Sequence, residues 1–220
     1  MTAEPIHLDN QPGEELAAYS AQLYQRGWMP GTAGNLSLRL PGDEERALIT
    51  ASGRDKGEMT ARDMVEIDAG TGATYGDGTL RASAEVSIHA AIYRAAPAGA
   101  VIHVHSPYAT AVATRASVDG AVARVPIERF ELLKGLGLAD PSRTQLPVFP
   151  NWPDVPRIAG DIEAHLRSTS GAPPGVLIAD HGITTWGADL AQARNRLECL
   201  EAICHLLLLT GAGLRPEPIA

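Results

Sequence analysis

The sequence of 220 residues lacks the glycine-rich fingerprints of nucleotide-binding enzymes. It contains neither a GxGxxG segment nor a GxxxxGK[ST] segment, and these are the loops that hold the phosphates of dinucleotides and of nucleoside triphosphates. Its longest apolar runs, such as 206–209, are far too short to cross a bilayer. A nucleotide-dependent enzyme and a membrane-spanning protein are therefore both disfavoured.

Cysteine and positive charge are also scarce. The two cysteines, Cys199 and Cys204, lie in one leucine-rich stretch, which predicts buried free thiols and no disulfide framework. That pattern is typical of a reducing compartment, and the first residues show no signal peptide, so we expect a cytoplasmic protein. The net charge of -8 and the pI near 5.3 argue against a nucleic-acid or anionic membrane partner. They do not exclude a phosphorylated substrate, because local amides and cations can hold a phosphate.

What the sequence does contain is an alternation of helical and extended patterns. Helices are predicted at 12–26, 83–96 and 189–209, and strands at 36–40, 47–50, 64–68, 100–105 and 176–179, with 127–138 partly helical. Ser83 is the predicted cap of the second helix. Hairpins mixed with helices predict an α/β protein of three layers, in which helices cover both faces of a central, mostly antiparallel sheet. With no linker or repeat to divide it, we expect one domain over 1–220, frayed over about 12 residues at the start and about 10 at the end.

A His-Val-His triplet directly follows the apolar run 100–102. Side chains alternate along a strand, so His103 and His105 are expected on one side of it, close enough to bind one divalent ion. Ser106 and Pro107 then end the strand. The alternative is two histidines at the rim of a sheet, one hydrogen-bonded and one solvated, and the pair alone does not decide between them.

His181 is the third candidate ligand. It follows the apolar strand 176–179 and precedes Gly182, which permits a sharp turn beside a ligand. Two histidines from one strand and one from another form the three-ligand set of a catalytic zinc, with open positions for a substrate. The alternative is that His181 only ends its strand, but two histidine-bearing strand ends favour a metal site. The remaining histidines are expected to be surface or packing residues: His7, His89, His165 and His205.

Two short loops have the composition of anion-binding turns. Residues 32–35 precede a predicted strand, and residues 51–57 follow another. Their amides, hydroxyl and ammonium groups are suited to a phosphate. The candidate donors are Gly34, Asn35, Ser52, Gly53 and Lys56. Alone, both loops are ordinary turn sequences, and they gain weight from the metal triad.

Two carboxylates are candidates for proton transfer. Glu85 lies in the first turn of a predicted helix, where a carboxylate also commonly stabilises the helix dipole. Glu131 lies three residues before Lys134, where the alternative is a surface ion pair. The residues themselves leave both alternatives open.

Five segments in chain order resemble the class II aldolase/adducin family. They are the Thr-Ala-Gly-Asn-Leu-Ser loop at 32–37, Ser-Gly at 52–53, Ser-Ala-Glu at 83–85, His-Val-His at 103–105 and Asp-His-Gly at 180–182. The resemblance covers residues 14–209 and implies the three-layer fold of that family. It also implies one Zn²⁺ per subunit held by His103, His105 and His181, phosphate contacts from the two loops with Ser83 nearby, and a homotetramer.

Further segments resemble the dehydratases of this family more than its aldolases. They are 52–57, 131–134, 147–151 with 154–157, and 181–187. The resemblance implies a dehydratase that removes water from 5-methylthioribulose 1-phosphate in methionine salvage, with Glu131 as its acid/base group. In the aldolases that role falls to the glutamate matching Glu85, and Ala84 stands where they usually carry a second serine. The alternatives are a sugar-phosphate aldolase or 4-epimerase for fuculose or ribulose phosphates, and a non-catalytic adducin-like module.

Overall fold

The computed structural model describes residues 11–76, 78–211 and 217–218. His7 and most of the two ends that were predicted to fray lie outside the described residues. Within the predicted C-terminal tail, Glu217–Pro218 forms a short strand, β9, which pairs with Ala123 and Arg124. The fraying of the two ends stays a prediction. That the whole chain acts as one domain stays a prediction.

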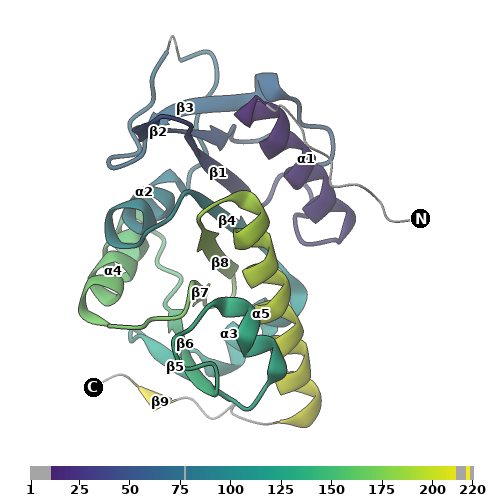
Figure 1. Cartoon of the computed structure of the whole chain (residues 1–220), viewed down its shortest axis with the longest axis vertical. Coiled ribbons are helices and arrows are strands. Elements are labelled where there is room, and N and C mark those ends of the chain that lie inside the picture. Colours follow the sequence, from purple (N-terminus) through teal and green to yellow (C-terminus); the bar gives the residue numbers. More distant parts are fainter. Residues whose placement is uncertain (1–10, 77, 212–216, 219–220) are drawn as a thin grey trace.

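The strands of the described residues form one nine-stranded sheet in the order β3-β2-β1-β4-β8-β7-β6-β5-β9 (Figure 1). Their bounds are β1 Asn35–Leu40, β2 Asp43–Thr50, β3 Met64–Asp68, β4 Ala100–Val104, β5 Ala123–Glu128, β6 Arg143–Phe149, β7 Gly175–Ile178 and β8 Gly182–Gly187. Every neighbouring pair is antiparallel except β6 with β7. The predicted mostly antiparallel sheet is confirmed.

Helices cover both faces of this sheet, as predicted (Figure 1). Their bounds are α1 Pro12–Gln25, α2 Val86–Ala95, α3 Pro107–Ala116, α4 Val155–Ser168 and α5 Leu190–Thr210, with short 3₁₀ helices η1 Ala61–Asp63 and η2 Glu131–Leu136. Helices α1, α3 and α5 bury their apolar sides in one core, and α2 and α4 bury theirs in a second core across the sheet. This is the three-layer α/β/α arrangement.

Most of the predicted elements are present, with shifted ends and several omissions. Helix α2 begins at Val86, and its N-cap residue is Glu85, so Ser83 does not cap it. The Ser83 hydroxyl instead accepts a hydrogen bond from the Glu85 amide at 3.3 Å, inside the turn before the helix. The segment 127–138 is partly helical, as expected, through η2. The sequence patterns did not reveal β5, β6, β8, α3 or α4.

Strand β4 lies in the interior of the sheet, between β1 and β8, and the alternation of its side chains determines the direction of His103. Ala100, Ile102 and Val104 point into the core shared with α5, whereas Val101 points into the core shared with α2. By the same alternation, His103 projects on the α2 side. That side carries the turn that leads into α2, and Glu85 lies in this turn.

Candidate metal centre

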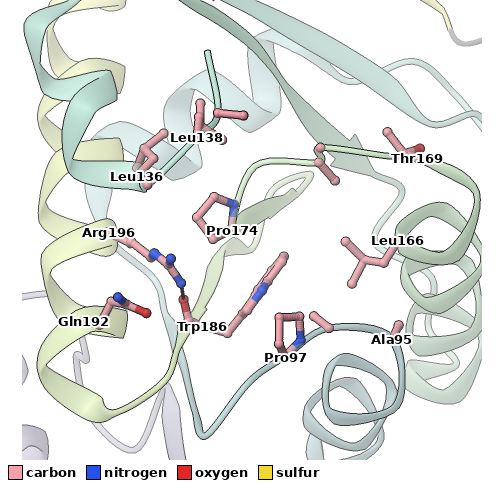
Figure 2. A pocket seen from close by; sticks show the side chains of 15 residues that line it. Ala95, Pro97, Leu136, Leu138, Leu166, Thr169, Pro174, Trp186, Gln192 and Arg196 are labelled. Carbon is pink, nitrogen blue, oxygen red and sulfur yellow. Dashed lines mark hydrogen bonds between the residues drawn. The ribbon is translucent and has the colours of Figure 1, made fainter. Parts of the chain in front are cut away.

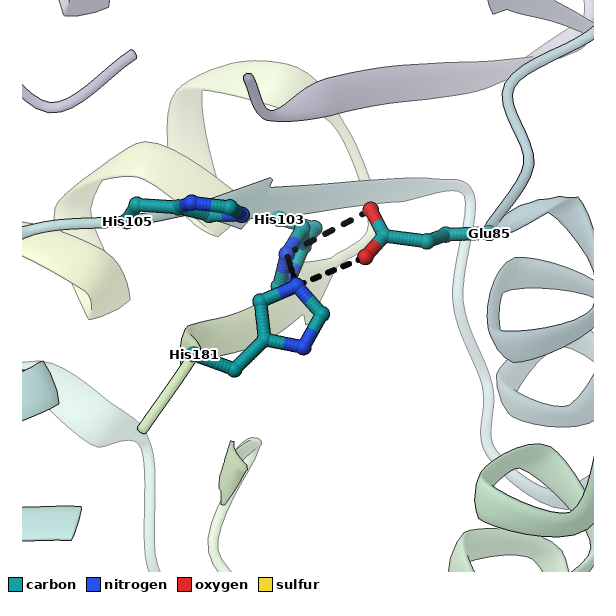
Figure 3. A group of neighbouring side chains, drawn as sticks. All are labelled: Glu85, His103, His105 and His181. Atoms are coloured by element: carbon teal, nitrogen blue, oxygen red, sulfur yellow. Dashed lines mark hydrogen bonds and ion pairs between the residues drawn. The ribbon is translucent and has the colours of Figure 1, made fainter. Parts of the chain in front are cut away.

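Four side chains from three separate parts of the chain meet at one end of β4 (Figure 3). Glu85, His103, His105 and His181 each present one potential ligand atom, and these atoms all lie within 4.8 Å of one another. The three imidazole centroids are 4.7–5.2 Å apart. The structure thus brings the three predicted ligands together, and it adds Glu85 to them.

Strand register determines the place of His103. Its partner on β1 is Asn35, and its partner on β8 is Thr184. The Thr184 hydroxyl lies 2.9 Å from Nδ1 of His103, so the other ring nitrogen, Nε2, faces the cluster. An imidazole anchored in this way through its far nitrogen is typical of metal ligands.

His105 follows the last residue of β4. The segment after it is fixed by hydrogen bonds to Glu201 of α5. The His105 amide donates to the carbonyl oxygen of Trp28 at 2.9 Å. Buried Glu201 accepts hydrogen bonds from the Ser106 hydroxyl at 2.7 Å and from the amides of Tyr108 and Ala109 at 2.9 and 2.8 Å. A carboxylate at the N-terminus of α3 is favourable for the helix dipole, and it fixes the chain immediately beyond His105.

His181 lies in the tight turn between β7 and β8, and Gly182 lets that turn pack against β4. A Cβ atom at Gly182 would lie 2.2 Å from the carbonyl oxygen of Val104, so no side chain fits there. Asp180 has a φ of 54°, a left-handed conformation that Asp adopts more readily than most residues. The close approach of the two strands brings Nε2 of His181 to 3.3 Å from Nε2 of His103.

The carboxylate of Glu85 lies between two of the histidines. Its Oε1 is 2.7 Å from Nε2 of His181, and its Oε2 is 3.4 Å from Nε2 of His103. Oε2 also accepts a hydrogen bond from the amide nitrogen of Asn35 at 2.5 Å. Burial alone would raise the pKa of Glu85, but His103, His181 and Asn35 outweigh it and hold that pKa well below its usual range.

Burial favours the neutral form of His103 and His105, which is the form that a metal ligand requires. Burial lowers the pKa of His103 to about 4, although Glu85 acts in the opposite direction. Burial also lowers the pKa of His105. The site therefore combines the uncharged imidazoles of His103 and His105 with the ionised carboxylate of Glu85.

These donors fit a divalent metal ion. Two nitrogen ligands of a tetrahedral zinc lie about 3.3–3.4 Å apart, given bonds of about 2.0–2.1 Å, and the Nε2 atoms of His103 and His181 are separated by 3.3 Å. Three imidazoles and a carboxylate suit zinc, iron or manganese. Nδ1 of His181 is buried and has no hydrogen-bond partner within the described chain, so the polar contacts of this ring are made through Nε2.

The predicted anion-binding loops lie next to each other and next to Glu85. Lys56 is 2% exposed, and its ammonium group donates to the carbonyl oxygens of Thr32 at 3.0 Å and Arg54 at 2.9 Å, which ties the two loops together. The amide of Ser52 donates to the Arg81 carbonyl oxygen at 2.9 Å, which joins the second loop to the segment before α2. Gly34 and Gly53 have φ of 76° and 70°, and such values favour glycine.

Comparison with known proteins agrees with this geometry. The family model described as the Class II Aldolase and Adducin N-terminal domain matches residues 14–208. The chain belongs to this family. It is 55% identical over 201 residues to a probable bifunctional methylthioribose-1-phosphate isomerase/methylthioribulose-1-phosphate dehydratase of Nocardia farcinica, which covers 91% of the chain. The chain spans 36% of the length of that relative.

Two further relatives match over most of their length. A methylthioribulose-1-phosphate dehydratase of Microcystis aeruginosa is 39% identical, over 90% of this chain and 96% of its own. The crystal structure of YgbL, a putative aldolase/epimerase/decarboxylase from Klebsiella pneumoniae, superposes with a TM-score of 0.75 at 30% identity, over 96% of this chain and 94% of that one. The class II aldolase fold predicted from the sequence is confirmed.

Glu131, the second predicted acid/base residue, does not lie in the cluster of metal-ligand candidates. Glu131 lies in η2, its side chain is 83% exposed, and its recorded partner is Lys134 at 2.7 Å. This is the surface ion pair that the sequence offered as the alternative. No hydrogen bond or ion pair links Glu131 to the four clustered side chains within the described chain.

Several residues that support the site escaped the sequence analysis. Thr184 and Glu201 carried no signal, because their roles depend on which strand and helix lie opposite them. His89 was expected to be a surface or packing residue; it is a fully buried packing residue, and both its ring nitrogens are also hydrogen-bonded, which the sequence did not reveal. The other two described histidines lie in helices, where His205 stacks on Tyr108 and His165 lies edge-on to Phe149.

The cavity drawn in Figure 2 lies elsewhere in this class II aldolase fold. It has a volume of about 420 Å³ and is lined by residues such as Pro97, Leu166 and Trp186. Trp186 lies near the end of β8 that is remote from His181. None of the predicted site residues lines this cavity. No helix of the described chain has the length and apolar content needed to cross a membrane.

Proposed function

We propose that the protein is a metal-dependent methylthioribulose-1-phosphate dehydratase. It would convert 5-methylthioribulose 1-phosphate to 2,3-diketo-5-methylthiopentyl 1-phosphate and water, a step of methionine salvage. The observation that carries the proposal is the cluster of three histidines and Glu85, whose ligand atoms lie within 4.8 Å of one another. The printed names of the Nocardia and Microcystis relatives support the choice of reaction and substrate.

We assign His103, His105 and His181 as the ligands of one Zn²⁺ per subunit, with Glu85 beside them. When bound, such an ion supplies Lewis-acid polarisation of the ketose oxygens. The neutral imidazole of His103, favoured by burial, and the anchored far nitrogen of the same ring support this assignment. The choice of zinc over iron or manganese rests on the preference of three-histidine catalytic sites.

The two loops and the turn before α2 would hold the substrate phosphate. Free amides at left-handed glycines are suited to an anion, and Gly34 and Gly53 provide this backbone shape. Ser52 and Ser83 add hydroxyl donors, and the Lys56 ammonium supports both loops from behind. Asn35 would serve the substrate only with the part of its amide that Glu85 and His89 leave free.

The reaction needs a proton taken from C3 and a proton given to the C4 hydroxyl. The C4 hydroxyl then leaves as water, and the resulting enol rearranges to the diketone. We assign this acid/base role to the carboxylate of Glu131, in keeping with the dehydratase segments of the sequence. Glu85 would orient the substrate from the metal side, where it is already paired with His181.

Glu131 can take this role in a homotetramer. Its side chain points into solvent in the isolated chain, paired with Lys134. We propose that it completes the site of a neighbouring subunit, since symmetric oligomers repeat one such contact at every subunit. We also place the enzyme in the cytoplasm, and the two free cysteines support this.

A sugar-phosphate aldolase or 4-epimerase is the second candidate. The observation that favours it is the position of Glu85, because this is the carboxylate that serves as acid/base in the aldolases and the one that lies at the cluster. In that case Glu131 would have no chemical role. A non-catalytic adducin-like module is disfavoured, because it would not need the cluster of three histidines and Glu85.

One substrate panel tests these candidates. The purified protein, stripped with a chelator and reloaded with Zn²⁺, is incubated with 5-methylthioribulose 1-phosphate, fuculose 1-phosphate and ribulose 5-phosphate. We expect diketone formation from the first and no cleavage or epimerisation of the others. Turnover of fuculose phosphate alone would establish the aldolase, and unchanged turnover after complete metal removal would contradict the proposal.

A further inference from the structure

A continuous line of buried polar side chains leads from the core of the protein to Glu85. The Tyr93 hydroxyl lies 2.7 Å from Oγ of Ser37, and Oγ of Ser37 lies 2.7 Å from Nδ1 of His89. Nε2 of His89 lies 2.6 Å from Oδ1 of Asn35, whose Nδ2 lies 2.5 Å from Oε2 of Glu85. The line therefore ends on the carboxylate that faces the metal ligands.

Helix α2, with its N-cap residue Glu85, and strand β1 supply all five residues of this line, at positions that the helical and strand repeats place on one side of each element. Glu85, His89 and Tyr93 are four residues apart along the start and the body of α2, so they lie on one side of it. Asn35 and Ser37 are two residues apart on β1, so they point to the same face of the sheet. Helix α2 packs on that face, and the four residues behind Glu85 are at most 5% exposed.

Each group in the line has one possible role. A carboxylate only accepts, so the Asn35 amide nitrogen donates to Glu85 and its oxygen accepts from His89. His89 then carries its proton on Nε2 and accepts from Ser37 through Nδ1, and Ser37 accepts from Tyr93. Burial lowers the pKa of His89 to about 3, which keeps the ring neutral and able to accept at Nδ1.

We propose that this line, centred on His89, is a positioning relay that fixes the orientation and charge of the Glu85 carboxylate at the metal centre. All its hydrogen bonds run in one direction, and bonds in such a chain polarise one another towards the charged end. His89 is a positioning residue, since it touches neither the ligands nor the proposed substrate. The inference deepens the proposed function and rests on it, because it takes Glu85 to face a bound metal ion.

Two substitutions at one position separate positioning from packing. In His89→Gln the side-chain amide nitrogen can reach the place of Nε2 and still donate to Asn35. In His89→Asn the shorter amide reaches only the place of Nδ1, so the contact with Ser37 can remain while the donor to Asn35 is lost. Both variants keep a polar side chain, so both should fold to a similar extent.

The readouts are the dissociation constant for Zn²⁺, measured by chelator competition without substrate, and kcat with 5-methylthioribulose 1-phosphate. We expect His89→Asn to lose about 10- to 100-fold in zinc affinity or kcat, as substitutions behind a metal ligand commonly do, and His89→Gln to recover most of that loss. Tyr93→Phe, at the far end, should change both values by less than His89→Asn. Thr185→Val removes a buried hydroxyl that bonds to the Ala193 carbonyl oxygen outside the relay, and it should keep both values.

Equal zinc affinity and kcat in His89→Gln, His89→Asn and the wild type would overturn the relay. If the His89 variants lost stability as Thr185→Val does but kept their zinc affinity and kcat, His89 would be a packing residue only, and the relay would be refuted. If the wild type does not dehydrate the substrate at all, the proposed function fails, while zinc affinity still tests the relay. The two failures are thus distinguishable.

Discussion

Glu85 and Glu131, the two glutamates suited to proton transfer, stand in contrasting surroundings. The side chain of Glu85 is 14% exposed and contacts two histidines and an asparagine, whereas that of Glu131 is 83% exposed and pairs with a lysine one turn away. Both lie where a helical segment begins. The difference arises from what lies opposite: β1 and β4 face Glu85, and solvent faces Glu131.

This contrast separates the part of a site that one chain can build from the part that a neighbour would add. The ligand cluster is complete within one chain, together with its supporting hydrogen bonds. The acid/base carboxylate of the proposed reaction is not. Experiments that act on one half at a time can therefore break or sharpen the distinction.

The largest effect is expected from His103→Ala. Removing this ligand should abolish zinc binding and lower kcat by about a thousandfold or more, because a bound metal ion contributes several kcal/mol of charge stabilisation. Metal analysis of the purified variant and the dehydration assay measure the two losses together. A metal-free variant that keeps full activity would refute the metal centre.

Glu131→Gln should separate chemistry from metal binding. We expect zinc content to stay at the wild-type level while kcat falls by about 10²- to 10⁴-fold, since the amide cannot transfer the proton. Both are measured on the same preparation. Unchanged turnover would pass the acid/base role to Glu85 and favour the aldolase type of mechanism.

Mixed assembly tests whether the two halves come from different subunits. Glu131→Gln and His103→Ala chains are unfolded, mixed in equal amounts and refolded together. If neighbouring subunits share each site, random assortment places a wild-type cluster beside a wild-type Glu131 in about one quarter of the sites. Activity near that fraction is expected, and no recovery from the mixture would place both halves in one chain.

A smaller effect is expected from Gly182→Ala. The added Cβ would lie 2.2 Å from the Val104 carbonyl oxygen, so the turn carrying His181 must move. Zinc affinity should fall by about tenfold or more, in the range seen when a ligand loses its support. Gly160→Ala is the matched control, because a Cβ there meets nothing within 4 Å in helix α4. It should keep zinc affinity and raise the free energy of unfolding by about 0.5–1 kcal/mol.

The smallest effect concerns Glu163, an ion-paired carboxylate remote from the cluster, which serves as a reference for Glu85 and Glu131. Hydrogen bonds from Arg94 and Arg167 lower its pKa from 4.5 to about 2. Its contribution to stability is therefore present above about pH 4.5 and is lost as the pH falls towards 2. In urea titrations, Glu163→Gln should flatten the pH dependence in this window by less than about 1 kcal/mol, with zinc affinity at pH 7 unchanged.

The sequence predicted the parts of the fold that carry a one-sided apolar pattern or a short apolar run after clear turn residues. Helices α1 and α5 bury one side, and strand β3 alternates buried and partly exposed positions. The fully buried strands β4 and β7 contain short apolar runs that follow proline and glycine. Strand β8 was missed because it is not an apolar run: it contains Thr184 and Thr185, whose buried hydroxyls bond to His103 and to the carbonyl oxygen of Ala193. Helix α3 was missed because Pro107 was read only as the end of a strand, although proline is also favourable in the first turn of a helix.

The candidate ligands could be predicted because histidines at strand ends are a local feature. The residues that hydrogen-bond to these ligands could not be predicted, since their positions depend on strand register and on helix placement. Asn35 on β1 lies opposite His103 on the neighbouring strand β4, and His89 reaches Asn35 only because α2 packs on the face of β1 that carries Asn35. Glu85 was correctly placed at a helix start, but its burial between two imidazoles followed only from the assembled sheet.

The contact between His103 and His181 joins positions 78 residues apart along the chain. It exists only after β8 has inserted beside β4 in the correct register, and such long-range pairings form slowly in folding. A chain with slipped strands would keep much of its far-ultraviolet circular dichroism yet take up no ion. The stoichiometry of metal in a preparation would therefore count the correctly folded molecules, which makes it a sharper quality criterion for refolded or stored protein than any measure of secondary structure.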